Sequence, residues 1–350
     1  MEEKRERKLN FDLLRILAAF SVVMLHSTAQ FWYDLDIYST EWAVANSYDA
    51  LFRFGVPVFV MISGALFLDK VVQIDVKLLY KHNILRMVII YAVWSCLYGL
   101  FDCKNLDIAV VGWKVVVREM LYGRYHLWFL PMIIGIYLIL PVLKSWLSNA
   151  DKRTIEYFLL LFVVLQVGRE TLRALTVTDE LHLILDLVDV EMVCSYLGYF
   201  VWGYYLTHIG ISERLRKIVY GLAVPAVVCN VVLGTVLSRR AGVPDGRLFD
   251  SYGLFTFIIV TALFVLTINK GVGMKCSFKA GRIIKEISAD TLGIYLLHVG
   301  LMEGIQPYGI HSMMLPNVVG IPLFAVLCFG VCMVVAAILR RIPVIGKYLC

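Results

Sequence analysis

The sequence predicts an all-α, polytopic integral membrane protein with about ten transmembrane helices, and three observations support this fold class. First, 60% of the 350 residues are apolar and 17% are charged, whereas soluble domains average about 45–50% apolar and about 25% charged residues. Second, ten charge-free runs of twelve or more residues follow one another along the chain, and a membrane-spanning helix needs roughly 20 mostly apolar residues. Third, no run alternates like a strand of a membrane barrel, and only helices and closed barrels pair all their backbone groups in hydrocarbon. This pattern excludes a soluble enzyme, a disordered chain and a nucleic-acid-binding domain.

We interpret each charge-free run as one transmembrane span. The runs are 16–33, 54–68, 87–101, 125–143, 157–168, 192–212, 218–238, 251–269, 291–302 and 304–339. The charged segment Met1–Asn10 resembles the start of a signal peptide, but the run after it is long and lacks a small-residue cleavage site, so we expect an uncleaved span. Segment 275–290 mixes basic and apolar residues, which predicts an amphipathic interfacial helix. We expect residues 1–350 to form one membrane domain without an appended soluble domain.

The loop charges predict the orientation of the protein in the membrane. When the loops between the ten runs are assigned alternately to two sides, 23 of the 33 Lys and Arg residues fall on one side. Because basic residues mark the cytoplasmic side, both termini are predicted to be cytoplasmic. The net charge of +6 reflects this loop asymmetry, so it does not indicate a nucleic-acid partner.

The first span carries three ionisable side chains that require an explanation, namely Asp12, Arg15 and His26. Asp12 lies three residues before Arg15, so the two can pair on one helix face. Arg15 and His26 are eleven residues apart, which places them on the same face and about 16 Å apart along the axis. Arg15 could be an interfacial arginine that reaches the headgroups, and His26 could be an interfacial histidine bonded to a carbonyl. Alternatively, Arg15 binds an anionic ligand in the cytoplasm and His26 transfers a proton deeper in the bundle.

The same residues carry a resemblance to a known family. Asp12-x-x-Arg15-x10-His26 resembles the first-helix signature of the membrane acyltransferase family 3, which contains bacterial O-acetyltransferases of cell-surface polysaccharides. Within this family, the sequence most resembles the short ten-span type, which is similar to the enterobacterial common antigen O-acetyltransferase. Four later segments are similar to further family segments, in the family's order: 55–64 ending in Ser-Gly, 126–131 reading HLWFLP, 198–205, and 293–298 ending in His298.

The resemblance implies a fold, a reaction and a location. The enzyme would move an acyl group, by default acetyl, from cytoplasmic acyl-CoA to a hydroxyl of a cell-surface or lipid-linked sugar, in the bacterial plasma membrane. Acetyl-CoA would be a co-substrate, and no metal is implied. Arg15, Arg86 and Lys81 would bind the CoA phosphates. Many relatives carry Arg-x-x-Arg before the third span, but Asn83 stands here at the first arginine position.

The reaction needs a base for the sugar hydroxyl and donors for the developing oxyanion. His26 would act as the base, with Asp12 and Arg15 in the same catalytic face, or it would itself accept the acyl group; the sequence leaves both mechanisms open. Candidates for substrate or oxyanion contacts are Ser63, His126, Trp128 and His298. Three of these residues also have a structural alternative. Ser63-Gly64 could form a close helix contact, His126 could hold an aromatic-belt position, and His298 could make a structural hydrogen bond.

Two outer groups of residues remain ambiguous. Asp49 and Arg53 are one turn apart and read as a local ion pair, with the weaker alternative that they grip the acceptor sugar. The aromatic residues Trp32, Tyr33, Tyr38 and Trp42 suit an interfacial belt or a sugar-stacking surface.

The competing class is a transporter or exporter of a small solute or glycolipid, because buried Arg and His also suit a transport path. Transporters often contain inverted repeats, and the first five runs share no pattern with the last five. A non-catalytic module that senses a cell-wall precursor is a third alternative. The spacing in the first span together with the HLWFL segment favours the enzyme.

Overall fold

The computed structural model describes residues 9–103, 113–176, 191–271, 277–343 and 346. Every regular element in these ranges is a helix, and none of the residues described lies in a strand. Seven helices in these ranges are long and apolar enough to cross a membrane: Leu9–Ala29, Thr40–Phe67, Val76–Asp102, Tyr125–Asn149, Glu213–Ala241, Arg247–Asn269 and Asn317–Arg341. The expected all-α, multi-pass membrane fold is therefore confirmed.

The helices follow the charge-free runs in order, with additional short elements between them. Their bounds are α1 Leu9–Ala29, α2 Thr40–Leu51, α3 Gly55–Phe67, α4 Val76–Leu78, η1 Leu79–Ile84, α5 Leu85–Cys103, α7 Trp113–Tyr122, η2 Tyr125–Trp128, α8 Phe129–Asn149, α9 Lys152–Leu161, η3 Phe162–Gly168, α10 Arg169–Leu175, α12 Glu191–Tyr204, η4 Tyr205–Ile209, α13 Glu213–Ala241, η5 Arg247–Phe249, α14 Leu254–Gly271, α15 Phe278–Ile305, η6 Gln306–Tyr308 and α16 Asn317–Arg341. Three expected spans, those in α9–α10, α12–η4 and α15, are not among the seven. Two of these helices carry charges, for example Glu156 and Arg169 in α9–α10 and Asp290 in α15.

The sequence predicts an amphipathic interfacial helix at 275–290. The structure has a helix there from Phe278 onward, which is the first half of α15 and continues without a break to Ile305. Ser277 caps the helix by accepting a hydrogen bond from the Ala280 amide at 3.2 Å. No proline interrupts 277–305, so one helix satisfies the backbone of both the amphipathic half and the ninth run. Residues 275 and 276 lie outside the described ranges.

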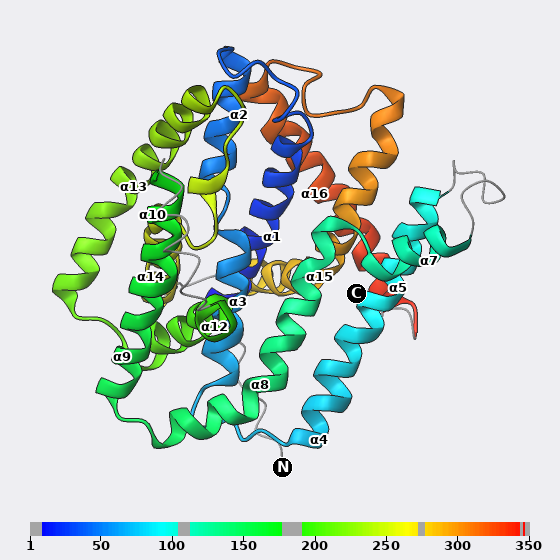
Figure 1. The fold of residues 1–350 in the computed structure, drawn as a ribbon. Helices are drawn as coiled ribbons and strands as arrows, with labels where there is room; N and C mark the ends of the chain where they lie inside the picture. The colour runs from blue at the N-terminus through cyan, green and yellow to red at the C-terminus, as the bar shows by residue number, and fades with distance from the viewer. Residues whose placement is uncertain (1–8, 104–112, 177–190, 272–276, 344–345, 347–350) are drawn as a thin grey trace.

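Helix α1 occupies the middle of the bundle (Figure 1) and contacts α2, α3, α14, α15 and α16. Its apolar residues Leu14, Ala18 and Val23 are fully buried, and so is Asp12. Since the polar side chains of α1 face protein rather than lipid, they can take part in a site inside the bundle.

Glycines allow α3 and α12 to pack at backbone distance. A Cβ added to Gly64 would lie 1.8 Å from the carbonyl oxygen of Phe200, and one added to Gly203 would lie 2.1 Å from that of Met61. Small residues at such positions let membrane helices approach closely. Gly64 thus has the structural role expected for Ser63-Gly64, which leaves the role of Ser63 to be decided by its own contacts.

We expect Gly64→Ala to lower the stability of the protein by about 3 kcal/mol, the upper end of the usual cost of overpacking, because the obstructing atoms belong to backbone. Gly135→Ala in α8 is the matched control, since a Cβ there meets no atom within 4 Å. Thermal unfolding of both purified variants in detergent tests this. Equal melting temperatures for Gly64→Ala and the wild type would contradict the close packing of α3 on α12.

Candidate active site

Three histidines from three separate elements meet inside the bundle: His26 of α1, His126 of η2 and His298 of α15. The ring centroids are 5.0 Å apart for His26 and His298, 5.4 Å for His126 and His298, and 6.4 Å for His26 and His126. We call them the histidine cluster. His126 and His298 are almost completely buried. The structure thus brings together three residues that the sequence suggested separately.

The ring nitrogens of the histidine cluster are mostly available for a ligand. His298 bonds through Nδ1 to the Tyr295 carbonyl at 2.6 Å, which assigns the proton to Nδ1 and leaves Nε2 as an acceptor. That Nε2, Nδ1 of His26 and both nitrogens of His126 are buried and have no hydrogen-bond partner within the described residues. Buried polar atoms left without a partner are costly, so their concentration in one place indicates a site that a bound group completes.

Tyrosines hold the cluster in place. The hydroxyl of Tyr98 in α5 donates to the Leu296 carbonyl at 2.7 Å and accepts from the Gly300 amide at 3.0 Å, while its ring packs on His126 at 4.9 Å. The hydroxyl of Tyr295 donates to the carbonyl of His126. These bonds fix η2 between α5 and α15 and therefore set the orientation of His126.

An ion-pair network next to η2 also stabilises the position of this turn. Arg124, two residues before His126, pairs with Asp102 of α5 through Nη1 and with Glu303 of α15 through Nη2. All three side chains are about one-quarter exposed. A guanidinium that binds two carboxylates from different helices defines the angle between them, and here it closes one end of the site.

A cavity of about 190 Å³ lies on one side of the cluster, and we call it the Arg15 cavity. Its lining includes Arg15, Val22, Ser63, Tyr137, Thr291 and Tyr295. The Nη1 of Arg15 lies 3.0 Å from Oδ1 of Asp12, and the same oxygen accepts a hydrogen bond from Ser288 at 2.8 Å. Asp12 thus holds the guanidinium in the lining of the cavity and ties α1 to α15.

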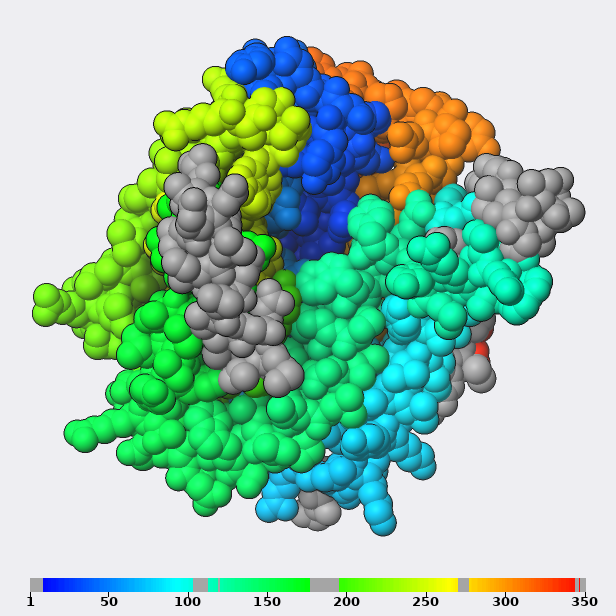
Figure 2. Space-filling view, in the orientation of Figure 1, coloured from blue at the N-terminus to red at the C-terminus, as the bar shows by residue number. Residues whose placement is uncertain are grey.

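A second cavity of about 350 Å³ lies on the other side, and we call it the His26 cavity. Its polar lining residues are His26, Gln30, Tyr33, Tyr125, Glu303 and Gln306. Along α1, Arg15 and Val22 line the first cavity and His26 and Ala29 the second, which is also lined by Gln30 just after the helix. Tyr295 lines the first cavity, and its ring contacts both His126 and His298, so the histidine cluster stands between the two spaces. Figure 2 shows the molecule hollowed on one face, with atoms of the N-terminal helices at the floor of the hollow.

The remaining predicted residues lie at different distances from the cluster. Ser63 donates its hydroxyl to the Phe59 carbonyl at 3.0 Å and lines the Arg15 cavity. Arg86 and Arg15 both interact electrostatically with Tyr137 in that cavity. Lys81 is exposed on η1, away from both cavity linings. The ring of Trp128 packs on Tyr196 at 5.5 Å, and Trp128 is among the lining residues of neither cavity.

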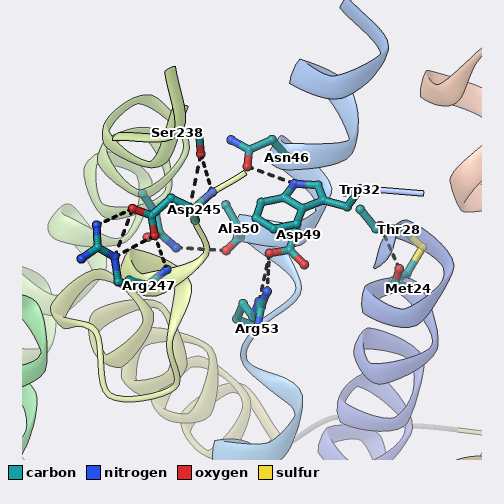
Figure 3. Close-up of polar contacts among 11 residues, drawn as sticks. Met24, Thr28, Trp32, Asn46, Asp49, Ala50, Arg53, Ser238, Asp245 and Arg247 are labelled. Carbon is teal, nitrogen blue, oxygen red and sulfur yellow. Dashed lines mark hydrogen bonds and ion pairs between the residues drawn. The ribbon is translucent and has the colours of Figure 1, made fainter. Parts of the chain in front are cut away.

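The outer aromatic set divides into two kinds of residue. Trp32 and Trp42 are buried and stack on each other at 6.1 Å, so they belong to the core and neither to a membrane belt nor to a sugar-binding surface. Trp32 also donates to the Asn46 side chain at 3.3 Å (Figure 3). Tyr33 and Tyr38 are 73% and 66% exposed, so these two alone keep the expected position at a surface.

Arg53 and Asp49 form the expected local ion pair, with Nε and Nη2 of Arg53 at 3.1 Å and 2.5 Å from Oδ2 of Asp49 (Figure 3). Arg53 also interacts electrostatically with His26. The neighbouring loop is held by Asp245, which accepts hydrogen bonds from the Arg247 amide and side chain. Burial acts to raise the pKa of Asp245, but these bonds outweigh it and hold the pKa below its ordinary value.

The sequence analysis missed several residues of this arrangement. Ser288, Tyr295 and Tyr98 act through contacts with elements far away in the chain, and no local pattern distinguishes them. The pairing of Arg124 with Glu303 joins residues 179 positions apart. The only sequence signal for this pairing is that Arg124 and Glu303 each stand at the end of an apolar run.

Comparison with known proteins identifies the class to which this site belongs. The family model described as an acyltransferase domain matches residues 8–340. The chain is therefore a membrane acyltransferase. It belongs to the acyltransferase 3 family, as the first-span signature and the HLWFL segment predicted. No curated protein and no solved structure matches the chain significantly.

We expect Arg15→Met to destabilise the protein by about 3–5 kcal/mol, because it removes the ion-pair partner of a fully buried carboxylate. The double variant Asp12→Asn, Arg15→Met removes both charges and should recover a large part of that loss. Thermal unfolding in detergent measures both. A double variant that is less stable than Arg15→Met alone would show that the Asp12–Arg15 pair does not set this stability.

Proposed function

We propose that the protein transfers an acetyl group from cytoplasmic acetyl-CoA to a hydroxyl of a cell-surface or lipid-linked sugar, with the chemistry at His26. The observation that carries this proposal is the position of the histidine cluster between two cavities, one lined by Arg15 and one with a polar lining. A donor and an acceptor approaching from opposite sides would meet at the unpartnered nitrogen of His26.

The Arg15 cavity suits the acyl end of the donor. Most of its lining is apolar, including Val22, Phe59 and Ile133, and its volume of about 190 Å³ is small. A narrow apolar passage fits the acyl-pantetheine arm, while the nucleotide and its phosphates would stay outside. Arg15 and Arg86 would bind phosphate oxygens at the entrance. The exposed Lys81 would supply the positive charge that is missing at Asn83, where many relatives have an arginine.

The transfer follows general-base catalysis. Nδ1 of His26 takes the proton of the acceptor hydroxyl while its oxygen attacks the thioester carbonyl. A carbon–oxygen bond forms, the carbon–sulfur bond breaks, and the CoA thiolate leaves and takes up the proton to become the thiol. The N–H of a neutral His126, whose ring nitrogens have no partner within the described residues, would donate to the oxyanion. In the alternative order His26 attacks the thioester first and passes the acyl group to the sugar.

We also propose that ten helices cross the plasma membrane of a bacterium and that both termini are cytoplasmic. Beyond the seven apolar spans, α9–α10, α12–η4 and α15 would supply three. The contacts Asp12–Ser288 and His26–His298 mean that α1 and α15 run in the same direction. Parallel first and ninth spans are what strict alternation of ten spans requires.

We expect His26→Ala to abolish acetyl transfer and to keep acetyl-CoA binding, since Arg15 and Arg86 remain. The control is His208→Gln, because His208 bonds to the Ala65 carbonyl in another part of the bundle. Transfer of labelled acetyl groups to surface glycans and acetyl-CoA binding to the purified protein are the two readouts. Full transfer by His26→Ala would disprove the mechanism, and a wild type that binds no acyl-CoA would disprove the function.

The topology makes a separate prediction. In a cysteine-free background, Asp34→Cys should react with an impermeant maleimide added to intact cells, whereas Lys77→Cys should react only after permeabilisation. Both positions are exposed. Asp34 follows the end of the first span and Lys77 lies at the start of the third, so the proposed topology places them on opposite sides of the membrane. The reverse pattern would invert the orientation and place the Arg15 cavity outside the cytoplasm.

A further inference from the structure

Gln30 has a buried amide that no protein group satisfies. It lies four residues after His26, in the turn that directly follows Ala29 at the end of α1, and it lines the same cavity as His26. Both Oε1 and Nε2 are buried and have no hydrogen-bond partner in the part of the chain that the structure describes. The buried amide of Asn46, in contrast, is used on both sides within the protein: it donates to Thr235 at 3.0 Å and accepts from Trp32 at 3.3 Å. Because this unpaired amide also lines a cavity, a ligand bound there can satisfy it.

The cavity that Gln30 lines has the properties of a small-molecule site. Its volume of about 350 Å³ falls in the range of roughly 300–1,000 Å³ that is usual for ligand pockets. The ring of Tyr125 lies 5.6 Å from that of His26, at the cavity wall. Tyr33 and Tyr125 are largely exposed, so their rings can cover the apolar face of a ligand at the entrance. Aromatic faces together with an unpaired amide suit a sugar ring, which has both apolar and hydroxyl-bearing surfaces.

The charges around the cavity limit the ligand further. Among the residues that the structure describes, none that lines the cavity is Lys or Arg, and Glu303 is the one acidic residue of that lining. Glu303 shares Arg124 with Asp102, so this network carries an excess negative charge. The nearby Arg53 is paired with Asp49. A carboxylate or phosphate on the ligand would therefore meet repulsion without a compensating cation.

We infer that the His26 cavity binds the acceptor as one uncharged sugar unit, and that Gln30 recognises it through hydroxyl groups on the ring that is acylated. The Nε2 of Gln30 donates to one hydroxyl and Oε1 accepts from a hydroxyl, while His26, one turn away, faces the reacting oxygen. Gln30 is thus an acceptor-binding residue that determines specificity. The inference rests on the proposed transfer to a sugar and adds the charge class of the acceptor and the residue that selects it.

The test uses the purified full chain in nanodiscs with acetyl-CoA and octyl glycosides of glucose, galactose, N-acetylglucosamine and N-acetylmannosamine, beside octyl glucuronide. We expect transfer to at least one uncharged glycoside with a kcat/KM at least tenfold above that for the glucuronide. Gln30→Met keeps the length of the side chain and removes its amide, and it should raise the acceptor KM at least tenfold without changing the Kd of acetyl-CoA. Gln30→Glu keeps only acceptor oxygens and should restore little of the loss.

Gln166→Met is the matched control. Gln166 is likewise buried with both amide atoms unpartnered, but it lies in η3 and lines neither cavity, so its substitution should leave the acceptor KM within twofold. An unchanged KM in Gln30→Met would overturn the inference. So would a preference for the glucuronide, or acetyl-CoA binding without transfer to any uncharged glycoside. A wild type that fails to bind acetyl-CoA would instead overturn the proposed function, and the two failures are thereby distinguished.

Discussion

The parallel packing of α1 against α15 is the constraint on which the site depends. At one end, Asp12 accepts hydrogen bonds from Arg15 and from Ser288 of α15. At the other end, His26 faces His298. Between these points the two helices line both cavities, with Tyr295 between them. In a low-dielectric interior an unpaired carboxylate is expensive, so the Asp12 contacts fix the register of the two helices. That register then determines which residues of α15 stand opposite His26.

The polar groups of the bundle differ in how the protein uses them. Asp12, Asp49, Tyr98 and Arg124 form bonds within the described residues that connect elements or stabilise a turn. His26 and Gln30 instead have partnerless side-chain atoms at the wall of a cavity, and the partnerless Nε2 of His298 belongs to the ring beside His26. Because a membrane interior offers little water to replace a missing bond, the second group marks where substrates are expected to bind. The same reasoning separates Ser63, whose hydroxyl is bonded to Phe59, from the histidines.

Much of the fold could be predicted from the sequence, since the apolar runs set the helices and their order. The helix predicted at 275–290 is present from Phe278 onward and continues as α15 to Ile305, because nothing in the segment stops it. One expectation failed. Trp32 and Trp42 were assigned to a surface, because tryptophan is common at membrane interfaces, but they stack inside the core. Seven helices meet the length and hydropathy needed for a span, and the helices that contain Glu156, Arg169, Asp290 and His298 are too polar to be recognised by these properties alone.

The sequence by itself determined the class of protein, the helices and the face of α1 that carries Asp12, Arg15 and His26. These are local properties, because run length and the helical repeat act within one segment. Only the tertiary structure decided that His126 and His298 join His26, that Ser288 holds Asp12, and that Gln30 lines a cavity. Those relations join residues up to 276 positions apart. The periodicity of one helix carries no information about which residue of another helix it will face.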